Sequence, residues 1–263
     1  MKTAVITSAA LFAANALAAP GTAARWANNA RRAGRTGGFK IPAPEDGVFA
    51  EVNGTAKNVQ YSSNWAGAVL SSSGYTSVVG TITVPTPKSN GKAGSASAWV
   101  GIDGDTCGTA ILQTGIDFSV SASGAVSYDA WYEWYPDYAY DFSGFPLKAG
   151  DQIKITVTAS SKKAGIATLQ NLTTGKSVSH SFSNEGNQLC EYDAEWIVED
   201  YEENGSLVSF ANFGSVTFTG ASAVKSGSTV GVSGAAILDI KQSSSVLTDC
   251  STSGSSTVTC SYV

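Results

Sequence analysis

Apolar and polar residues alternate along several stretches after residue 60. The run 152–159 alternates cleanly, and so does the run 215–219. Alternation with a period of two puts the apolar side chains on one face, which predicts half-buried antiparallel strands. Turn-forming steps separate such runs, at Asn90-Gly91, Ser123-Gly124, Thr174-Gly175 and Asn204-Gly205. Because no long apolar pattern has a helical period, residues 61–263 are predicted to form one all-β domain, a sandwich or a jelly roll.

Three segments combine apolar, aromatic and acidic residues: 98–118, 128–138 and 194–201. Within the first, alternation puts Gln113 and Asp117 on the face opposite the apolar side chains. In the other two, the groups that share a face are Trp131, Glu133 and Tyr135, and Glu195, Ile197 and Glu199. A sheet face with acids, an amide and aromatic rings resembles a groove for an extended polymer, either peptide or sugar. The alternative is that the aromatic run belongs to the core and the acids lie on a solvated face.

The histidine count and the net charge exclude several classes of function. His180 is the only histidine, which argues against a histidine-rich metal site and leaves one candidate for a Ser-His-Asp triad. The 263 residues include 21 acidic and 16 basic side chains, a net charge of −5. This acidity argues against nucleic acid or an anionic membrane as the main partner. We expect no cofactor and no metal ion.

The first 60 residues differ in composition from the rest. Residues 1–18 have the basic start, the short apolar run and the small-residue cleavage pattern of a secretory signal peptide. Residues 19–60 hold all four arginines, two lysines and three acids, whereas residues 61–263 hold nine lysines and eighteen acids, a net of 9 − 18 = −9. We therefore predict a basic propeptide over 19–60 that docks on an acidic domain, with a disordered linker as the alternative. Processing is expected between Phe49 and Tyr61, and the product is expected to be extracellular.

The chain has four cysteines, Cys107, Cys190, Cys250 and Cys260. An even number in a secreted chain predicts two disulfides, for which three pairings are possible. The short spacing of Cys250 and Cys260 favours a link within the C-terminal tail, which would leave Cys107 to pair with Cys190. Zinc is a poor alternative because no C-x-x-C pair is present.

Four motifs carry a resemblance to a known family: Trp99–Asp105, Ile111–Gly115, Trp131–Pro136 and Glu195–Asp200. On these motifs, and over residues 61–220, the sequence resembles the fungal glutamic peptidases (eqolisins) of the scytalidoglutamic and aspergilloglutamic type. The resemblance implies a lectin-like β-sandwich of two curved antiparallel sheets. It also implies an acid endopeptidase that is insensitive to pepstatin and is made as a preproprotein.

The resemblance further implies a catalytic dyad, which falls on Gln113 and Glu195. The neighbours of the family cleft fall on Trp99, Asp103, Asp117, Trp131, Glu133 and Tyr135. Our hypothesis is that Glu195 acts as general base on a water while the amide of Gln113 donates to the oxyanion. A glutamate can serve as a base near pH 4, where a histidine would be protonated, so acidic working conditions are expected.

Two other functions are compatible with the residue pattern. A glycoside hydrolase could use Glu133 and Glu195 as its two carboxylates, and a secreted carbohydrate-binding module could stack sugars on the aromatic strand. For the peptidase, the expected partners are polypeptide substrates and its own propeptide as inhibitor, and a monomer is expected. The acid excess also predicts stability in acid and a loss of stability toward neutral pH.

Overall fold

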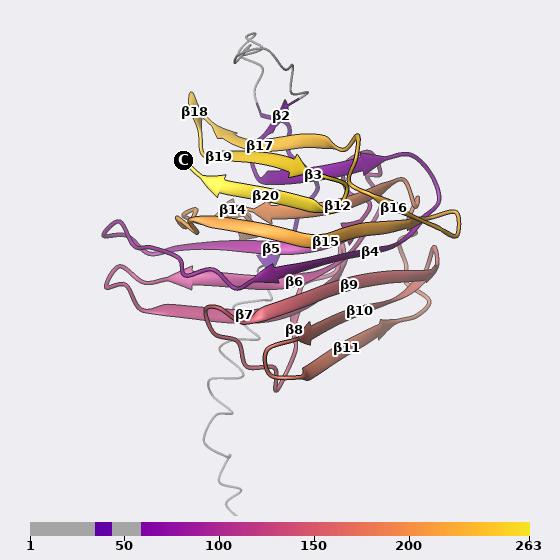
Figure 1. Ribbon diagram of the computed structural model, residues 1–263, viewed down its shortest axis with the longest axis horizontal. Coiled ribbons are helices and arrows are strands. Elements are labelled where there is room, and N and C mark those ends of the chain that lie inside the picture. Colours follow the sequence, from indigo (N-terminus) through magenta and orange to yellow (C-terminus); the bar gives the residue numbers. More distant parts are fainter. Residues whose placement is uncertain (1–34, 44–58) are drawn as a thin grey trace, which may run out of the picture.

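The computed structural model describes residues 35–43 and 59–263, and within these residues it contains strands but no helix. Two large sheets pack face to face (Figure 1), so the predicted all-β sandwich is confirmed. The predicted signal peptide, residues 1–18, lies outside the described residues.

The larger sheet has nine strands in the order β18-β17-β3-β12-β5-β6-β7-β8, with β2 paired to β17. Their bounds are β2 (Val59–Ser62), β3 (Trp65–Ser71), β5 (Gly94–Ile102), β6 (Ile111–Val120), β7 (Val126–Tyr135), β8 (Tyr140–Asp141), β12 (Asp193–Glu199), β17 (Ala236–Gln242) and β18 (Ser245–Val246). All pairings in this sheet are antiparallel except that of β2 with β17, which is parallel and departs from the expected pattern.

The second sheet has eight strands in the order β11-β10-β9-β4-β15-β20-β19, with β16 paired to β15. Their bounds are β4 (Tyr75–Thr83), β9 (Gln152–Ser161), β10 (Ala164–Asn171), β11 (Lys176–Phe182), β15 (Ser215–Lys225), β16 (Ser228–Gly231), β19 (Thr248–Ser253) and β20 (Thr257–Tyr262). The two alternating runs of the sequence lie within β9 and β15, as predicted. Gly124, which has a φ of 88°, lies in the predicted turn between β6 and β7, where glycine adopts this conformation at little cost.

A small third sheet contains β1 (Arg35–Thr36), β13 (Glu202–Glu203) and β14 (Ser206–Leu207). In it, Arg35 pairs with Glu203 and Thr36 with Glu202. Residues 35 and 36 therefore extend the β13–β14 hairpin by one strand. This brings part of the predicted propeptide onto the folded domain.

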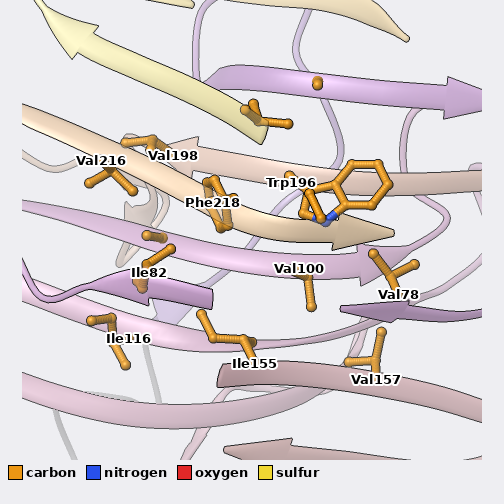
Figure 2. Packing of buried hydrophobic residues seen from close by; sticks show 14 of the residues in the cluster. Val78, Ile82, Val100, Ile116, Ile155, Val157, Trp196, Val198, Val216 and Phe218 are labelled. Atoms are coloured by element: carbon orange, nitrogen blue, oxygen red, sulfur yellow. The ribbon is translucent and has the colours of Figure 1, made fainter. Parts of the chain in front are cut away.

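The main core fills the space between the two large sheets (Figure 2). Val78, Ile155 and Phe218 come from the eight-stranded sheet, and they meet Val100 and Trp196 of the nine-stranded sheet. The indole of Trp196 also donates a hydrogen bond across the sandwich to the carbonyl of Val79 (2.8 Å). Each buried side chain of this size contributes roughly 1.5–3 kcal/mol by leaving water.

A second apolar cluster covers the opposite face of the nine-stranded sheet. Its members are Trp65, Val69, Trp99, Ile111, Trp131, Ala139, Ile197 and Leu238. All seven residues of β12 are buried as a consequence, since both faces of this strand are covered. The functional side chains predicted on β6, β7 and β12 lie on this second face.

The structure pairs Cys107 with Cys190 and Cys250 with Cys260, which is the arrangement that the sequence favours. The second bridge joins the adjacent strands β19 and β20. The first ties the segment after β5 to the segment before β12, close to the predicted catalytic glutamate.

Candidate active site

The sheet register brings Gln113 and Glu195 to the same face, with one strand between them. Gln113 on β6 pairs with Gly101 on β5, and Gly101 pairs in turn with Glu195 on β12. Two strand spacings separate the two backbones, roughly 10 Å. Gly101 has no side chain, so the space between Gln113 and Glu195 on this face is left to the Trp99 ring and the carboxyl group of Glu195. A Cβ on residue 101 would lie 3.2 Å from Oε2 of Glu195 and 2.7 Å from the Trp99 ring, so the site requires glycine here.

Gln113 is fully buried and its amide has a fixed orientation. Its Nε2 donates to Oε2 of Glu133 (3.0 Å) on the neighbouring strand β7. The same nitrogen donates to the backbone carbonyl of Gly37 (3.1 Å). Because a carboxylate can only accept, Glu133 determines which end of the amide is the nitrogen. The N–H groups of Gln113 therefore face the main chain that crosses the site.

Glu195 is also fully buried, and within residues 35–43 and 59–263 neither of its carboxylate oxygens has a hydrogen-bond partner. Burial raises the pKa of Glu195 well above its ordinary value, and the nearby carboxylates of Asp193, Asp103 and Asp105 raise it further. A glutamate with a raised pKa and no structural partner has the properties of a proton-transfer group.

A third buried acid, Glu199, lies four residues after Glu195 in β12 and on the same face. It accepts hydrogen bonds from the indole nitrogens of Trp99 (2.8 Å) and Trp65 (3.3 Å). Burial raises its pKa to about 8, although Arg35 and the two indoles act in the opposite direction. Trp99, predicted to contact substrate, is fully buried beneath the site and holds this carboxyl group.

Asp117, which lies four residues after Gln113 on β6, forms an ion pair with Arg35. Nη2 of Arg35 donates to Oδ1 of Asp117 (2.8 Å) and to the hydroxyl of Ser97 (3.2 Å). The guanidinium also lies over the rings of Trp131 (4.2 Å) and Tyr201 (4.5 Å). The side chains of Arg35 and Asp117 are only 3% and 5% exposed, so this ion pair is shielded from solvent. Asp117 and Trp131, both predicted neighbours of the cleft, thus contact the same guanidinium.

Phe39 packs edge-on against the predicted Tyr135, with ring centroids 4.7 Å apart. Glu133 contacts the same crossing segment, since its Oε2 accepts a hydrogen bond from the amide of Gly37 (3.3 Å). Residues 35–39 therefore touch Gln113 and four of its six predicted neighbours. The basic composition of residues 19–60 predicted that a propeptide docks on the domain. It did not indicate which residues make the contact, because a net charge does not specify which residue lies opposite which.

Asp103, a predicted neighbour of the cleft, is held by backbone amides. Its carboxylate accepts from four successive backbone amides at distances of 2.6–3.2 Å, those of Cys190, Glu191, Tyr192 and Asp193. The reason is local: β5 ends at Ile102, and Asp103 has a φ of 72°, so the alternation stops and its side chain turns away. Asp103 thus holds the segment that leads into β12, the strand of Glu195, and its carboxylate raises the pKa of Glu195.

The comparisons with known proteins agree with this geometry. Residues 63–262 match the family model described as the Peptidase A4 family. The sequence is 53% identical to Aspergillopepsin-2 of Aspergillus niger, over 100% of both chains, and 46% identical to Scytalidopepsin B of Scytalidium lignicola, over 99% of this chain and 98% of the relative. A solved structure, scytalido-glutamic peptidase with a transition state analog inhibitor, matches with a TM-score of 0.71 and 48% identity, covering 76% of this chain and 98% of that one.

Proposed function

The chain belongs to the Peptidase A4 family and is a glutamic-type peptidase, and we propose that it is an acid endopeptidase whose catalytic dyad is Glu195 and Gln113. One observation carries this proposal above the others. Nε2 of Gln113 donates to a peptide carbonyl, that of Gly37, on the face that also holds the buried carboxyl group of Glu195. The carbonyl of Gly37 stands in the position that the scissile carbonyl of a substrate would take.

The proposed reaction needs no covalent enzyme intermediate. Release of residues 35–43 would let solvent reach Glu195 and so favour its ionised form, because burial is the main cause of its raised pKa. The ionised Glu195 accepts a proton from a water as the water oxygen bonds to the scissile carbonyl carbon. The carbonyl oxygen becomes an oxyanion and accepts a hydrogen bond from the N–H of Gln113. Glu133 keeps the amide of Gln113 in the orientation that this hydrogen bond needs. Glu195 then returns the proton to the amide nitrogen as the C–N bond breaks. The products are a carboxylic acid and an amine, and Glu195 ends in its starting state.

The lone histidine takes no part in this scheme. His180 stacks on Tyr132, with ring centroids 4.0 Å apart. Tyr132 neighbours Glu133 on β7, and its ring points to the opposite face of the sheet. A base other than histidine suits acidic conditions, because imidazole would be protonated there.

The decisive assay is hydrolysis of a denatured protein at pH 3–4 in the presence of pepstatin. We expect cleavage at internal peptide bonds and no loss of rate with pepstatin, because the dyad is not a pair of aspartates. Release of reducing sugar from polysaccharide, or sugar binding without turnover, would point instead to the glycoside hydrolase or the binding module. Family membership does not favour either alternative, and Glu133, the second acid that a glycosidase would need, is held by Gln113.

We also propose that residues 35–43 act as an inhibitor within the precursor. Arg35 fills the subsite of Asp117, and the backbone of residues 35 and 36 pairs with β13 as a substrate strand would. Glu195 is fully buried with this segment in place, which leaves solvent no access to the carboxyl group. The same proposal includes a signal peptide over 1–18, a propeptide over 19–60, secretion of a monomer, and the domain 61–263 as the mature enzyme.

Gly37 explains how the segment can lie on the dyad. A Cβ on residue 37 would come within 2.6 Å of Nε2 of Gln113 and 3.0 Å of Oε2 of Glu133. The main chain can therefore approach this closely only at a glycine. A substrate with a side chain at this position would lie slightly farther from Gln113 and Glu133 than this segment does.

A nine-residue peptide with the sequence of residues 35–43 should inhibit the mature enzyme. Gly37→Ala should raise its inhibition constant at least about tenfold through the steric clash, and Arg35→Gln should do so through the lost ion pair. Gly38→Ala is the matched control, because a Cβ on residue 38 meets nothing within 4 Å. Equal inhibition by all four peptides would disprove the proposed mode of binding.

A further inference from the structure

Within residues 35–43 and 59–263, two asparagines begin the pattern Asn-X-Ser/Thr, at Asn171-Leu172-Thr173 and at Asn204-Gly205-Ser206. In a chain that passes through the secretory pathway, this pattern is the acceptor for an N-linked glycan. The pattern alone does not distinguish the two asparagines. Their surroundings in the folded protein do, because a glycan is bulky and hydrophilic and has to lie in solvent.

The side chain of Asn171, at the end of β10, is part of the folded core of its turn. It is only 1% exposed, and its Nδ2 donates to Oδ2 of the buried Asp151 (2.9 Å). Its Oδ1 accepts from the backbone amides of Thr173 and Thr174 (both 3.0 Å). The hydroxyl of Thr173 in turn accepts from the amide of Gln152 (2.9 Å). A glycan replaces one hydrogen of Nδ2, so a chain modified at Asn171 would have to bury a sugar beside Asp151 and could not form this turn.

Asn204 has the opposite surroundings. Asn204 and Gly205 are the two loop residues of the hairpin between β13 and β14, in which Glu203 pairs with Ser206. Their φ angles are both positive, 54° and 76°, as a two-residue turn of type I′ requires, and asparagine followed by glycine forms this turn at the least cost. All three residues of the acceptor pattern are exposed. A glycan on Asn204 would therefore extend into solvent from the tip of the hairpin.

The docked segment leaves the tip of this hairpin uncovered. β1 pairs with β13 through Arg35 opposite Glu203 and Thr36 opposite Glu202, and this pairing ends before the turn. A glycan is attached in the secretory pathway, which is before the predicted propeptide is removed. The precursor can thus carry a glycan on Asn204 and still hold residues 35 and 36 against β13.

We propose that Asn204 carries an N-linked glycan in the secreted protein and that Asn171 does not. The donor is an oligosaccharide linked to a lipid pyrophosphate. Nδ2 of Asn204 bonds to C1 of the first sugar as the bond from C1 to the pyrophosphate oxygen breaks; the amide gives up one proton, and the lipid pyrophosphate leaves. The proposal rests on the secretion proposed above and is independent of the catalytic dyad.

The test is to express the full chain, including residues 1–18, in a yeast and to map the peptides of the secreted protein by mass spectrometry. Enzymatic removal of N-glycans in heavy-oxygen water converts each glycosylated asparagine to an aspartate that carries the heavy isotope. Ser206→Ala removes the acceptor pattern and leaves the Asn204-Gly205 turn in place. Ser206→Thr is the matched control, because it changes the same exposed residue and keeps the hydroxyl group that the pattern needs.

We expect the heavy label on residue 204 of the wild-type protein and of Ser206→Thr, and its complete loss in Ser206→Ala. Residue 171 should be unlabelled in all three proteins. A secreted wild-type protein without label on residue 204 would overturn the proposal. So would label on residue 171, because burial would then not decide which asparagine is modified. Asn53, in the pattern Asn53-Gly54-Thr55, lies outside the described residues and is identified on its own peptide.

If no protein is secreted, the predicted signal peptide is wrong, which contradicts the proposed secretion and not the glycan site. The same three proteins are then produced behind a secretion signal of the yeast, and the label on residues 204 and 171 decides the proposal in the same way.

Discussion

Replacing Glu195 by glutamine should abolish peptide hydrolysis while the fold stays intact. Glutamine has nearly the same size and shape but cannot accept the proton of the attacking water or return it to the leaving amine. Loss of a general base that later acts as general acid is expected to lower kcat by about 10³-fold or more. Because burial already favours the uncharged form of Glu195, a neutral amide should be accommodated without loss of stability.

The measurement is kcat/KM on a peptide at pH 4 together with the melting temperature of each protein. Glu199→Gln is a useful comparison, since it makes the same change four residues further along β12, at a carboxyl group that is held by two indoles. It should retain far more activity than Glu195→Gln. A Glu195→Gln enzyme with the wild-type rate would show that the dyad is wrongly assigned.

Gln113→Glu should lower the rate by roughly 10²–10³-fold, which is the usual contribution of one oxyanion donor. The substitution removes the N–H groups and places a second carboxyl group next to Oε2 of Glu133. Gln188→Glu makes the same change at an exposed residue away from the cleft and should leave the rate unchanged. If Gln113→Glu hydrolyses peptides at the wild-type rate, the amide of Gln113 has no part in the mechanism. The main argument against a glycosidase would then also be lost.

The sandwich could be predicted from the sequence because several strands have one face in the core and one in water. In β9 the residues alternate between buried and partly exposed positions, and this pattern is directly visible in the sequence. β12 is different, since all seven of its residues are buried beneath two covered faces. Its acids therefore do not indicate a solvated face. In β12, an acid among apolar residues marks a buried carboxyl group, with a correspondingly raised pKa.

The candidate site could be predicted only as far as strand alternation continues. Gln113 and Glu133 lie where their strands place them, on the face opposite the core residues Leu112 and Trp134. The contacts of Asp103 with four backbone amides could not be predicted, because the alternation ends one residue earlier, at a backbone angle that the sequence does not reveal. Arg35 lies 82 residues before its partner Asp117, and only the folded chain brings them together.

The folded protein should lose stability as the pH rises from about 4 to 8. Burial raises the pKa of Glu199 to about 8 and that of Asp200 to about 7, both far above the ordinary values. Such groups stabilise the fold fully below the unfolded-state pKa, and this contribution disappears as the pH rises through the folded-state pKa. The loss is at most about 4 kcal/mol for each group. His180 acts in the opposite sense, because burial lowers its pKa, but it is more exposed than either acid.

Asp200→Asn isolates one of these groups and should raise the melting temperature at pH 7.5 by about 5–10 °C, while changing it little at pH 4. The asparagine oxygen can still accept the hydrogen bond that Nε2 of Gln242 donates to Asp200 (2.7 Å), so the change removes the charge and keeps the contact. Asp137→Asn makes the same substitution at an exposed residue and should leave both melting temperatures unchanged. A wild-type protein that melts higher at pH 7.5 than at pH 4 would contradict the argument. The expected result is that the wild-type protein melts at a lower temperature at pH 7.5 than at pH 4, and that Asp200→Asn restores part of this loss. Buried carboxyl groups such as that of Asp200 would then be the reason why the fold is more stable in acid.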